Sequence, residues 1–132
     1  MRSLLSRILR GKQNAEVFAA LPMNHRLYAI GDVHGRDDLL SILLTLINKD
    51  VETYAGQVWI VFLGDYVDRG PQSRDVIERL LALKDTNTCA YRFLLGNHEQ
   101  TMLDFLAMAP ASEHWLRYGG IETLESYGVA IE

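Results

Sequence analysis

The sequence predicts an α/β fold built from repeated strand-helix units around a largely parallel sheet. Three short runs rich in β-branched and aromatic residues alternate with segments whose apolar residues recur at helical spacing. Each run stops at a glycine followed by a polar residue, and these pairs stand roughly 30 residues apart, the length of one strand-helix-strand unit. The carboxyl ends of parallel strands meet at one edge of a sheet, so we expect the polar loops to gather there.

The first unit begins near Arg26. A strand is predicted over residues 26–30 and ends at Gly31. A helix is predicted over 37–48, because its apolar residues repeat every three to four positions: Leu39, Leu40, Leu43, Leu46 and Ile47.

The second unit has the same order. The run over 57–63 predicts a strand that ends at Gly64. Ser73 then opens a helical pattern formed by Val76, Ile77, Leu80, Leu81 and Leu83.

The third unit completes the alternation. A strand is predicted over 91–95 and meets Gly96, and a helix over 99–108 ends before Pro110.

Composition limits the classes of protein to consider. A length of 132 residues predicts one domain, and 48% hydrophobic with 23% charged residues excludes disordered, collagen-like and disulfide-scaffold chains. A net charge of −4 argues against nucleic acid as a partner. The single cysteine, Cys89, cannot close a disulfide within the chain and fits a reducing cytoplasm.

Residues 1–25 are predicted to be a basic amphipathic helix followed by a loop that leads into the domain over 26–132. Arg7 interrupts the apolar residues and no small-residue cleavage site follows, so the segment is not a secretory signal. We expect a short helix or a tether here and no membrane-surface role. The apolar runs are shorter than the roughly 18 to 20 residues of a membrane span.

Two residues of the first loop predict a metal site. Asp32 and His34 stand two positions apart directly after a strand, where an extended backbone would point both side chains the same way. Val33 lies between them and is expected to face the core.

The second and third loops add further candidate ligands. Asp65, Asp68 and Arg69 follow the second strand, and Asn97 and His98 follow the third. Taken singly, these residues are also consistent with an internal Asp–Arg pair and with Asn97 as a helix N-cap. Together they supply oxygen and nitrogen ligands suited to manganese, iron or zinc.

The three motifs together resemble a known family. GDVHG at 31–35, GDYVDRG at 64–70 and GNHE at 96–99 closely resemble the calcineurin-like metallophosphoesterases. The second and third motifs look most like the phosphoprotein phosphatase branch, which hydrolyses phosphoserine and phosphothreonine, and residues 115–128 are similar to its bacterial members. The resemblance covers roughly residues 26–128 and implies half of a β-sandwich flanked by helices.

The resemblance also implies roles for individual residues, around two divalent metal ions. Manganese is expected from the bacterial relatives, with iron or zinc as alternatives. The first metal would be bound by Asp32 and His34, both metals by Asp65, and the second by Asn97. A hydroxide bridging the metals would attack phosphorus. The resemblance then assigns phosphate binding to Arg69, the general acid to His98, and the hydrogen bond that orients His98 to Asp68. It leaves the role of Glu99 open.

The family's domain normally continues with two further histidine ligands, and His114 matches neither. We therefore expect the chain to be the N-terminal half of a phosphatase, with exposed sheet edges through which it self-associates. The expected substrate is a phosphorylated protein or a small phosphoester. Two alternatives stay open: a hydrolase of dinucleoside polyphosphates or other small phosphoesters, and a catalytically silent metal-binding or regulatory remnant.

Overall fold

A computed structural model describes residues 20–86, 89–108 and 110–130. The helix predicted at the start of the chain lies outside these residues. The described part of the leading segment, residues 20–24, contains a turn closed by the hydrogen bond from His25 N–H to the Pro22 carbonyl (3.2 Å).

The sheet has three parallel strands, β1 (His25–Ile30), β2 (Gln57–Phe62) and β3 (Ala90–Phe93), in the order β1-β2-β3. The predicted parallel α/β fold is therefore confirmed. The third strand ends two residues earlier than predicted, because its pairing partner β2 itself ends at Phe62.

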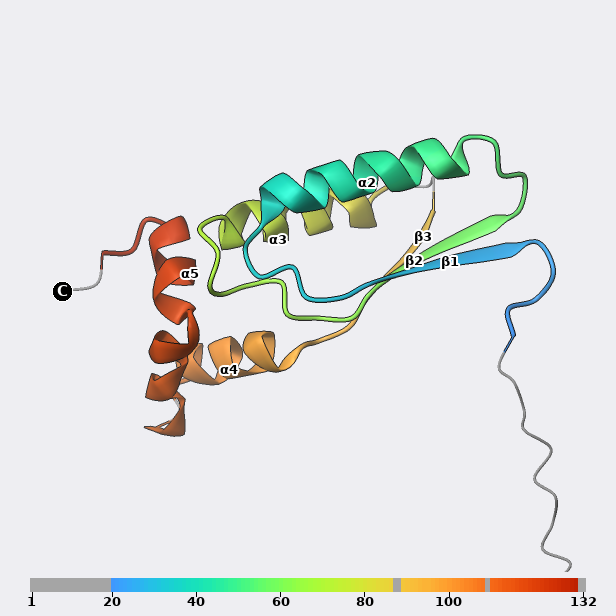
Figure 1. Ribbon diagram of the computed structural model, residues 1–132. Helices are drawn as coiled ribbons and strands as arrows, with labels where there is room; N and C mark the ends of the chain where they lie inside the picture. The colour runs from blue at the N-terminus through green and yellow to red at the C-terminus, as the bar shows by residue number, and fades with distance from the viewer. Residues whose placement is uncertain (1–19, 87–88, 109, 131–132) are drawn as a thin grey trace, which may run out of the picture.

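Two helices, α2 (Asp37–Val51) and α3 (Ser73–Lys84), lie over one face of the sheet, as Figure 1 shows. Each helix connects one strand to the neighbouring parallel strand, and both connections step across the sheet in the same direction, from β1 to β2 and from β2 to β3. Both helices therefore lie on the same side of the sheet. The core lies between the helices and this face. Its members include Ile30, Leu40, Leu44, Ile60, Phe62, Val76 and Leu80.

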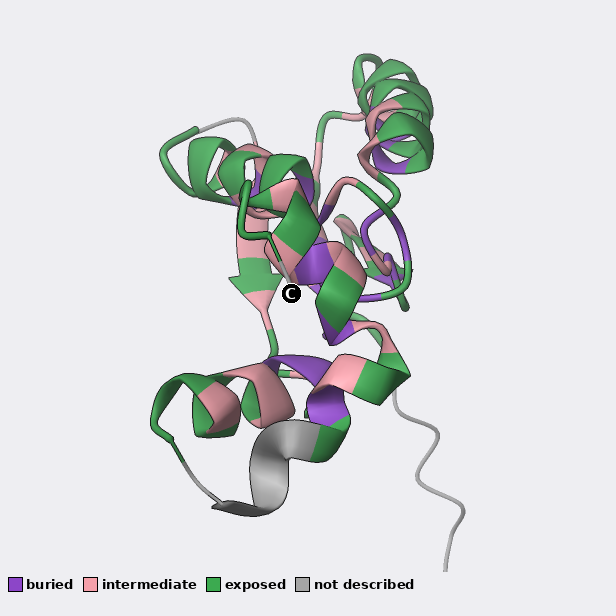
Figure 2. Cartoon of the chain, turned by 90° about the vertical axis from the view of Figure 1, so that its left-hand side faces the viewer, coloured by how far each residue is buried: buried purple, intermediate pink, exposed green. Residues whose placement is uncertain are grey.

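The remaining elements lie beyond the carboxyl ends of the strands. Helix α4 (Asn97–Leu106) follows β3, and a 3-10 helix (Pro110–Tyr118) then leads to α5 (Gly120–Ser126). Figure 2 views the molecule from this end and shows buried residues where α5 faces the loops. Helix α4 begins two residues before the predicted start and ends at Leu106, and Pro110 opens a new helical segment.

The other face of the sheet is only partly covered by the described residues. Leu27 of β1 is 43% exposed and Trp59 of β2 is half-buried. Within the described part of the chain, no helix is both long and apolar enough to cross a membrane.

Candidate functional site

The three polar loops lie together at the carboxyl end of the sheet. The backbone N–H groups of Val33 and His34 both donate to the Asp65 carbonyl, at 2.9 and 3.0 Å, and the Gly35 N–H donates to the Tyr66 carbonyl at 2.8 Å. These bonds join the first loop to the second. Val33 is buried, as its position between two site residues predicted.

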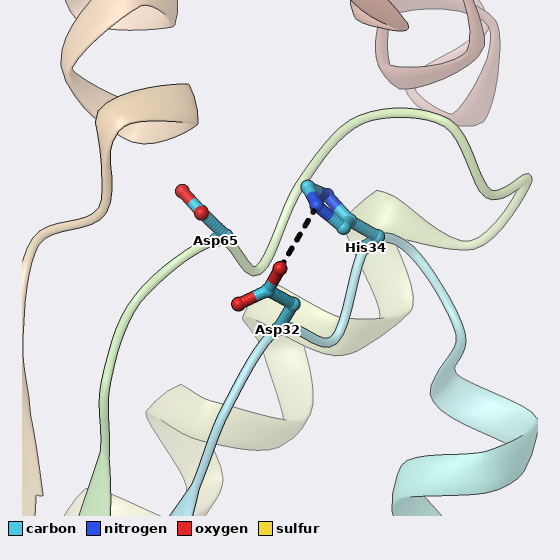
Figure 3. Close-up of side chains that lie close together, drawn as sticks. All are labelled: Asp32, His34 and Asp65. Carbon is cyan, nitrogen blue, oxygen red and sulfur yellow. Dashed lines mark ion pairs between the residues drawn. The ribbon is translucent and has the colours of Figure 1, made fainter.

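Asp32, His34 and Asp65 form the first cluster (Figure 3). One potential ligand atom from each of the three residues lies within 4.8 Å of the others. His34 Nε2 and Asp32 Oδ2 are 3.7 Å apart, and the Asp32 side chain is 68% exposed. The cluster therefore opens to solvent and presents two carboxylates and an imidazole.

The tautomer of His34 suits a metal ligand. His34 Nδ1 lies 2.8 Å from the Val67 carbonyl oxygen, which can only accept, so Nδ1 carries the hydrogen. The lone pair of Nε2 then faces the carboxylates. Metal-binding histidines commonly donate their other ring N–H to a carbonyl in this way, so the donor set fits a divalent cation.

The backbone brings Asp32 and His34 together by a turn, and the expected extended geometry is wrong. Strand β1 ends at Ile30, and His34 has a positive φ of 45°. The left-handed backbone at His34 turns the imidazole toward Asp32. The alternation of side chains along an extended strand was expected to produce the same approach.

A cleft of about 350 Å³ is lined in part by a second group of predicted residues, Arg69, Asn97 and His98. Asn97 is the first residue of α4 and Gly96 is the N-cap, so the interpretation of Asn97 as an N-cap is wrong. The His98 backbone N–H donates to Asp65 Oδ1 at 3.1 Å, which ties this group to the first cluster.

Arg69 connects the two groups. Its NH1 lies 2.8 Å from His34 Nε2 and its NH2 lies 3.1 Å from His98 Nε2. The two imidazole rings meet edge to face with centroids 4.6 Å apart. Arg69 therefore donates to two histidines, and no ion pair joins it to Asp68 within the described residues, contrary to the internal Asp–Arg interpretation.

Asp68 is fully buried behind His98. Its Oδ2 accepts from His98 Nδ1 at 2.6 Å and from Trp115 Nε1 at 2.7 Å, and its Oδ1 accepts from the Thr123 hydroxyl at 2.7 Å. The resemblance predicted the contact with His98. The sequence interpretation missed the contributions of Trp115 and Thr123.

Glu99 is the other contributor that the sequence interpretation left without a role. Its carboxylate is 5% exposed and accepts four backbone N–H bonds. Oε1 accepts from Tyr66 (2.7 Å) and Val67 (3.2 Å), and Oε2 from Asp65 (2.8 Å) and Gly96 (3.0 Å). One carboxylate thus fastens the second loop to the start of α4. The available signal was a glutamate at the third helical position, where it can cap the N-cap N–H.

Close approach of these loops also depends on Gly96, because a Cβ there would collide with the Asp65 side chain. Tyr66 braces the same region, since its hydroxyl donates to the Leu94 carbonyl at 2.6 Å. Burial raises the pKa of Tyr66 to about 12, and the neighbouring carboxylate of Glu99 acts in the same direction.

Comparison with known proteins is consistent with this geometry. A family model, calcineurin-like phosphoesterase, matches residues 25–130. A symmetrical bis(5'-nucleosyl)-tetraphosphatase from Enterobacter sp. (strain 638) is 41% identical over 80 residues, covering 61% of this chain and 26% of that protein. A zinc-dependent endopolyphosphatase from Saccharomyces cerevisiae is 30% identical over 95 residues, covering 72% of this chain and 27% of that protein.

Among solved structures, a mutant of a cold-active protein tyrosine phosphatase superposes with a TM-score of 0.52 at 26% identity, covering 90% of this chain and 37% of that one. The chain spans only about a quarter of the length of each of the two curated relatives named here. Its family implies divalent metal ions. On the family match over most of its length, the chain belongs to the calcineurin-like phosphoesterases.

Proposed function

We propose that this chain carries the metal- and phosphate-binding loops of a metal-dependent serine/threonine phosphoprotein phosphatase. The observation that carries the proposal is the position of Arg69. Its guanidinium lies between His34 of the first cluster and His98, which is hydrogen-bonded to the buried Asp68. The residues proposed to bind phosphate and to deliver a proton, Arg69 and His98, therefore lie next to the proposed metal ligands.

Asp32, His34 and Asp65 would hold one cation, and Asp65 with Asn97 would contribute to a second. When bound, divalent cations supply Lewis-acid polarisation of the phosphate and a water activated at neutral pH. We propose manganese from the resemblance to bacterial members of the family. The cytoplasmic location expected from the sequence stays a prediction.

Arg69 can either donate to His34 or bind phosphate at this site. Its NH1 donates to the His34 Nε2 lone pair, and a lone pair used as a metal ligand cannot also accept that hydrogen bond. Metal binding at His34 would therefore free a guanidinium N–H. The planar guanidinium can then hold two oxygens of a phosphate group.

His98 is positioned to deliver a proton. Its Nδ1 is hydrogen-bonded to Asp68, and its Nε2 lies at the cleft and accepts from Arg69 NH2 at 3.1 Å. When Arg69 turns to a phosphate group, Nε2 is free to carry a proton and pass it to the departing alkoxide. Serine and threonine are poor leaving groups without such help, and this fits a phosphoprotein substrate.

A second candidate is hydrolysis of dinucleoside polyphosphates, favoured by the 41% identity to a bis(5'-nucleosyl)-tetraphosphatase. A third, the catalytically silent module, keeps the fold and a metal without turnover. The exposed Asp32 side chain makes the site accessible to either kind of phosphate ester.

Manganese-dependent hydrolysis of p-nitrophenyl phosphate by the whole chain is the first test, with Asp65→Asn purified in parallel as the control. A phosphoserine peptide and diadenosine tetraphosphate are then compared as substrates. We expect activity with manganese, loss in Asp65→Asn, and preference for the phosphopeptide.

Three other results would each redirect the interpretation. Preference for diadenosine tetraphosphate would support the second candidate. Equal activity in both proteins would indicate a contaminant. Metal binding by the wild-type chain without hydrolysis would support the silent module.

A further inference from the structure

We propose that Trp115 and Thr123 are positioning residues that orient His98 by holding Asp68 from its far side. The catalytic meaning of this inference rests on the proposed function, whereas the hydrogen-bonded chain itself is independent of it. The two residues come from different elements, the 3-10 helix and α5, that follow the three motifs in the chain.

The Asp68 carboxylate needs partners because it is fully buried. An ionised carboxylate removed from water is costly unless hydrogen bonds satisfy its oxygens. Three side-chain donors meet this need: His98 and Trp115 at Oδ2, and Thr123 at Oδ1. Two of the three come from the segment after α4, so His98 alone does not fix the carboxylate plane.

Thr123 holds both ends of Asp68. Its hydroxyl donates to Asp68 Oδ1 at 2.7 Å and accepts from the Asp68 backbone N–H at 2.8 Å. Asp68 has a positive φ of 74°, an unfavourable conformation for a residue with a side chain. The hydroxyl therefore stabilises the strained backbone and orients the carboxylate together. Thr123 is 1% exposed, so water does not compete for these bonds.

Trp115 is equally enclosed. It is 1% exposed, its ring centroid lies 4.9 Å from that of Phe105, and the indole N–H is directed to Asp68 Oδ2 at 2.7 Å. Trp115 is also among the residues that line the cleft with Asn97 and His98. It therefore lies between the cleft and the buried carboxylate that its indole N–H holds.

The consequence is a chain of contacts from Trp115 and Thr123 through Asp68 to His98 Nδ1. The angle of the carboxylate fixes the orientation of the imidazole, and so the direction of Nε2 toward a leaving group. Without the Thr123 hydroxyl, Oδ1 loses its side-chain donor, and without the Trp115 indole, Oδ2 keeps His98 alone. Either change gives the carboxylate more rotational freedom. His98 is then held less firmly, although neither Trp115 nor Thr123 touches the reacting atoms.

The test is NMR of the ring N–H protons in the whole chain, free of metal. We expect His98 Nδ1–H to give a downfield resonance that exchanges slowly with water. In Trp115→Phe, which keeps an aromatic ring, and in Thr123→Val, which keeps the shape of the side chain, its exchange accelerates by about tenfold or more. Thr123→Ser retains the hydroxyl and should preserve the signal. Trp59→Phe is the matched control, because Trp59 lies on β2, away from Asp68.

An unchanged His98 resonance in both Trp115→Phe and Thr123→Val would overturn the inference. If these variants do not fold, the wild-type chain still decides, because Trp115 N–H should exchange at least about tenfold more slowly than Trp59 N–H. Equal exchange of the two indoles would contradict the buried hydrogen bond.

Activity provides a separate readout. Trp115→Phe should lower kcat more for a phosphoserine peptide than for p-nitrophenyl phosphate, whose leaving group needs less protonation, and an equal loss would contradict positioning of the acid. A wild-type chain without any turnover would count against the proposed function, and the NMR result would stand on its own.

Discussion

Backbone strain is concentrated at the residues that carry the chemistry. His34, Asp65, Asp68 and Arg69 all have positive φ, between 45° and 74°. Such a conformation costs about 1–2 kcal/mol per residue. A strained backbone conformation persists only where surrounding contacts hold it. Here these contacts are hydrogen bonds between the loops, such as the one from the Val33 N–H to the Asp65 carbonyl.

Glu99 is the residue on which this loop arrangement most depends. In Glu99→Gln an NH₂ group replaces one oxygen and faces backbone N–H donors, so at least one pair of hydrogen bonds is lost. We expect the free energy of unfolding to fall by about 2–4 kcal/mol in urea denaturation. Manganese affinity should fall by about 10–100-fold in titration calorimetry, because Asp65 loses its support.

The matched control is Glu125→Gln, which alters an exposed glutamate of α5. It should change stability by no more than about 0.5 kcal/mol. If Glu99→Gln is as stable as Glu125→Gln, the four backbone contacts do not fasten the loops in solution.

At the scale of elements, the entry of α5 is set by the close approach of its first turn to the second loop. Gly119 has φ 109°, and its carbonyl accepts the Arg69 N–H at 3.2 Å. A Cβ at this position would collide with the Arg69 backbone. The glycine is thus needed for its backbone angle and for its size.

Gly119→Ala separates these two needs when compared with Gly128→Ala. Gly128 also has a positive φ, 79°, but a Cβ there would meet nothing within 4 Å. We expect Gly119→Ala to lose about 2 kcal/mol more than Gly128→Ala, measured by thermal and urea unfolding. Equal losses would mean that α5 moves away from Arg69 without cost, and would weaken its proposed hold on Asp68.

The periodicity of the sequence was sufficient to predict the elements of the sheet layer and the edge at which the loops meet. It could not predict how the 3-10 helix and α5 serve the site, because Trp115 and Thr123 stand 47 and 55 residues from Asp68. The left-handed turn at His34 has no local pattern, and the position of Glu99 in α4 indicates its bond to the Gly96 N–H but not those to the second loop. Both result from contacts between loops that only the folded chain brings together.

At the scale of the whole molecule, apolar surface remains uncovered among the described residues. Leu39, Ile42 and Leu46 of α2 are between 51% and 59% exposed, and β1 and β3 form the edges of the described sheet. Exposed strand edges and apolar patches favour association. Self-association, expected from the sequence, therefore stays a prediction.

Metal binding should stabilise the whole domain, because the cation would join the first two strand-helix units. Asp32 and His34 follow β1, and Asp65 follows β2. A cation that binds only the folded chain adds about 2.7 kcal/mol at a hundredfold excess over its Kd. For a domain of this size we expect manganese to raise Tm by about 10 °C, reversibly with chelator, in scanning calorimetry.

Two variants show whether this cluster is responsible for the stabilisation. Asp65→Asn removes one of two neighbouring negative charges, so its metal-free form should be at least as stable as the wild type. It should also lose most of the manganese shift. Asp85→Asn, which alters an exposed aspartate beyond α3, should keep the full shift. A shift of equal size in Asp65→Asn and in the wild type would mean that manganese binds elsewhere on the chain, and the three loop residues would then lose their assignment as a metal site.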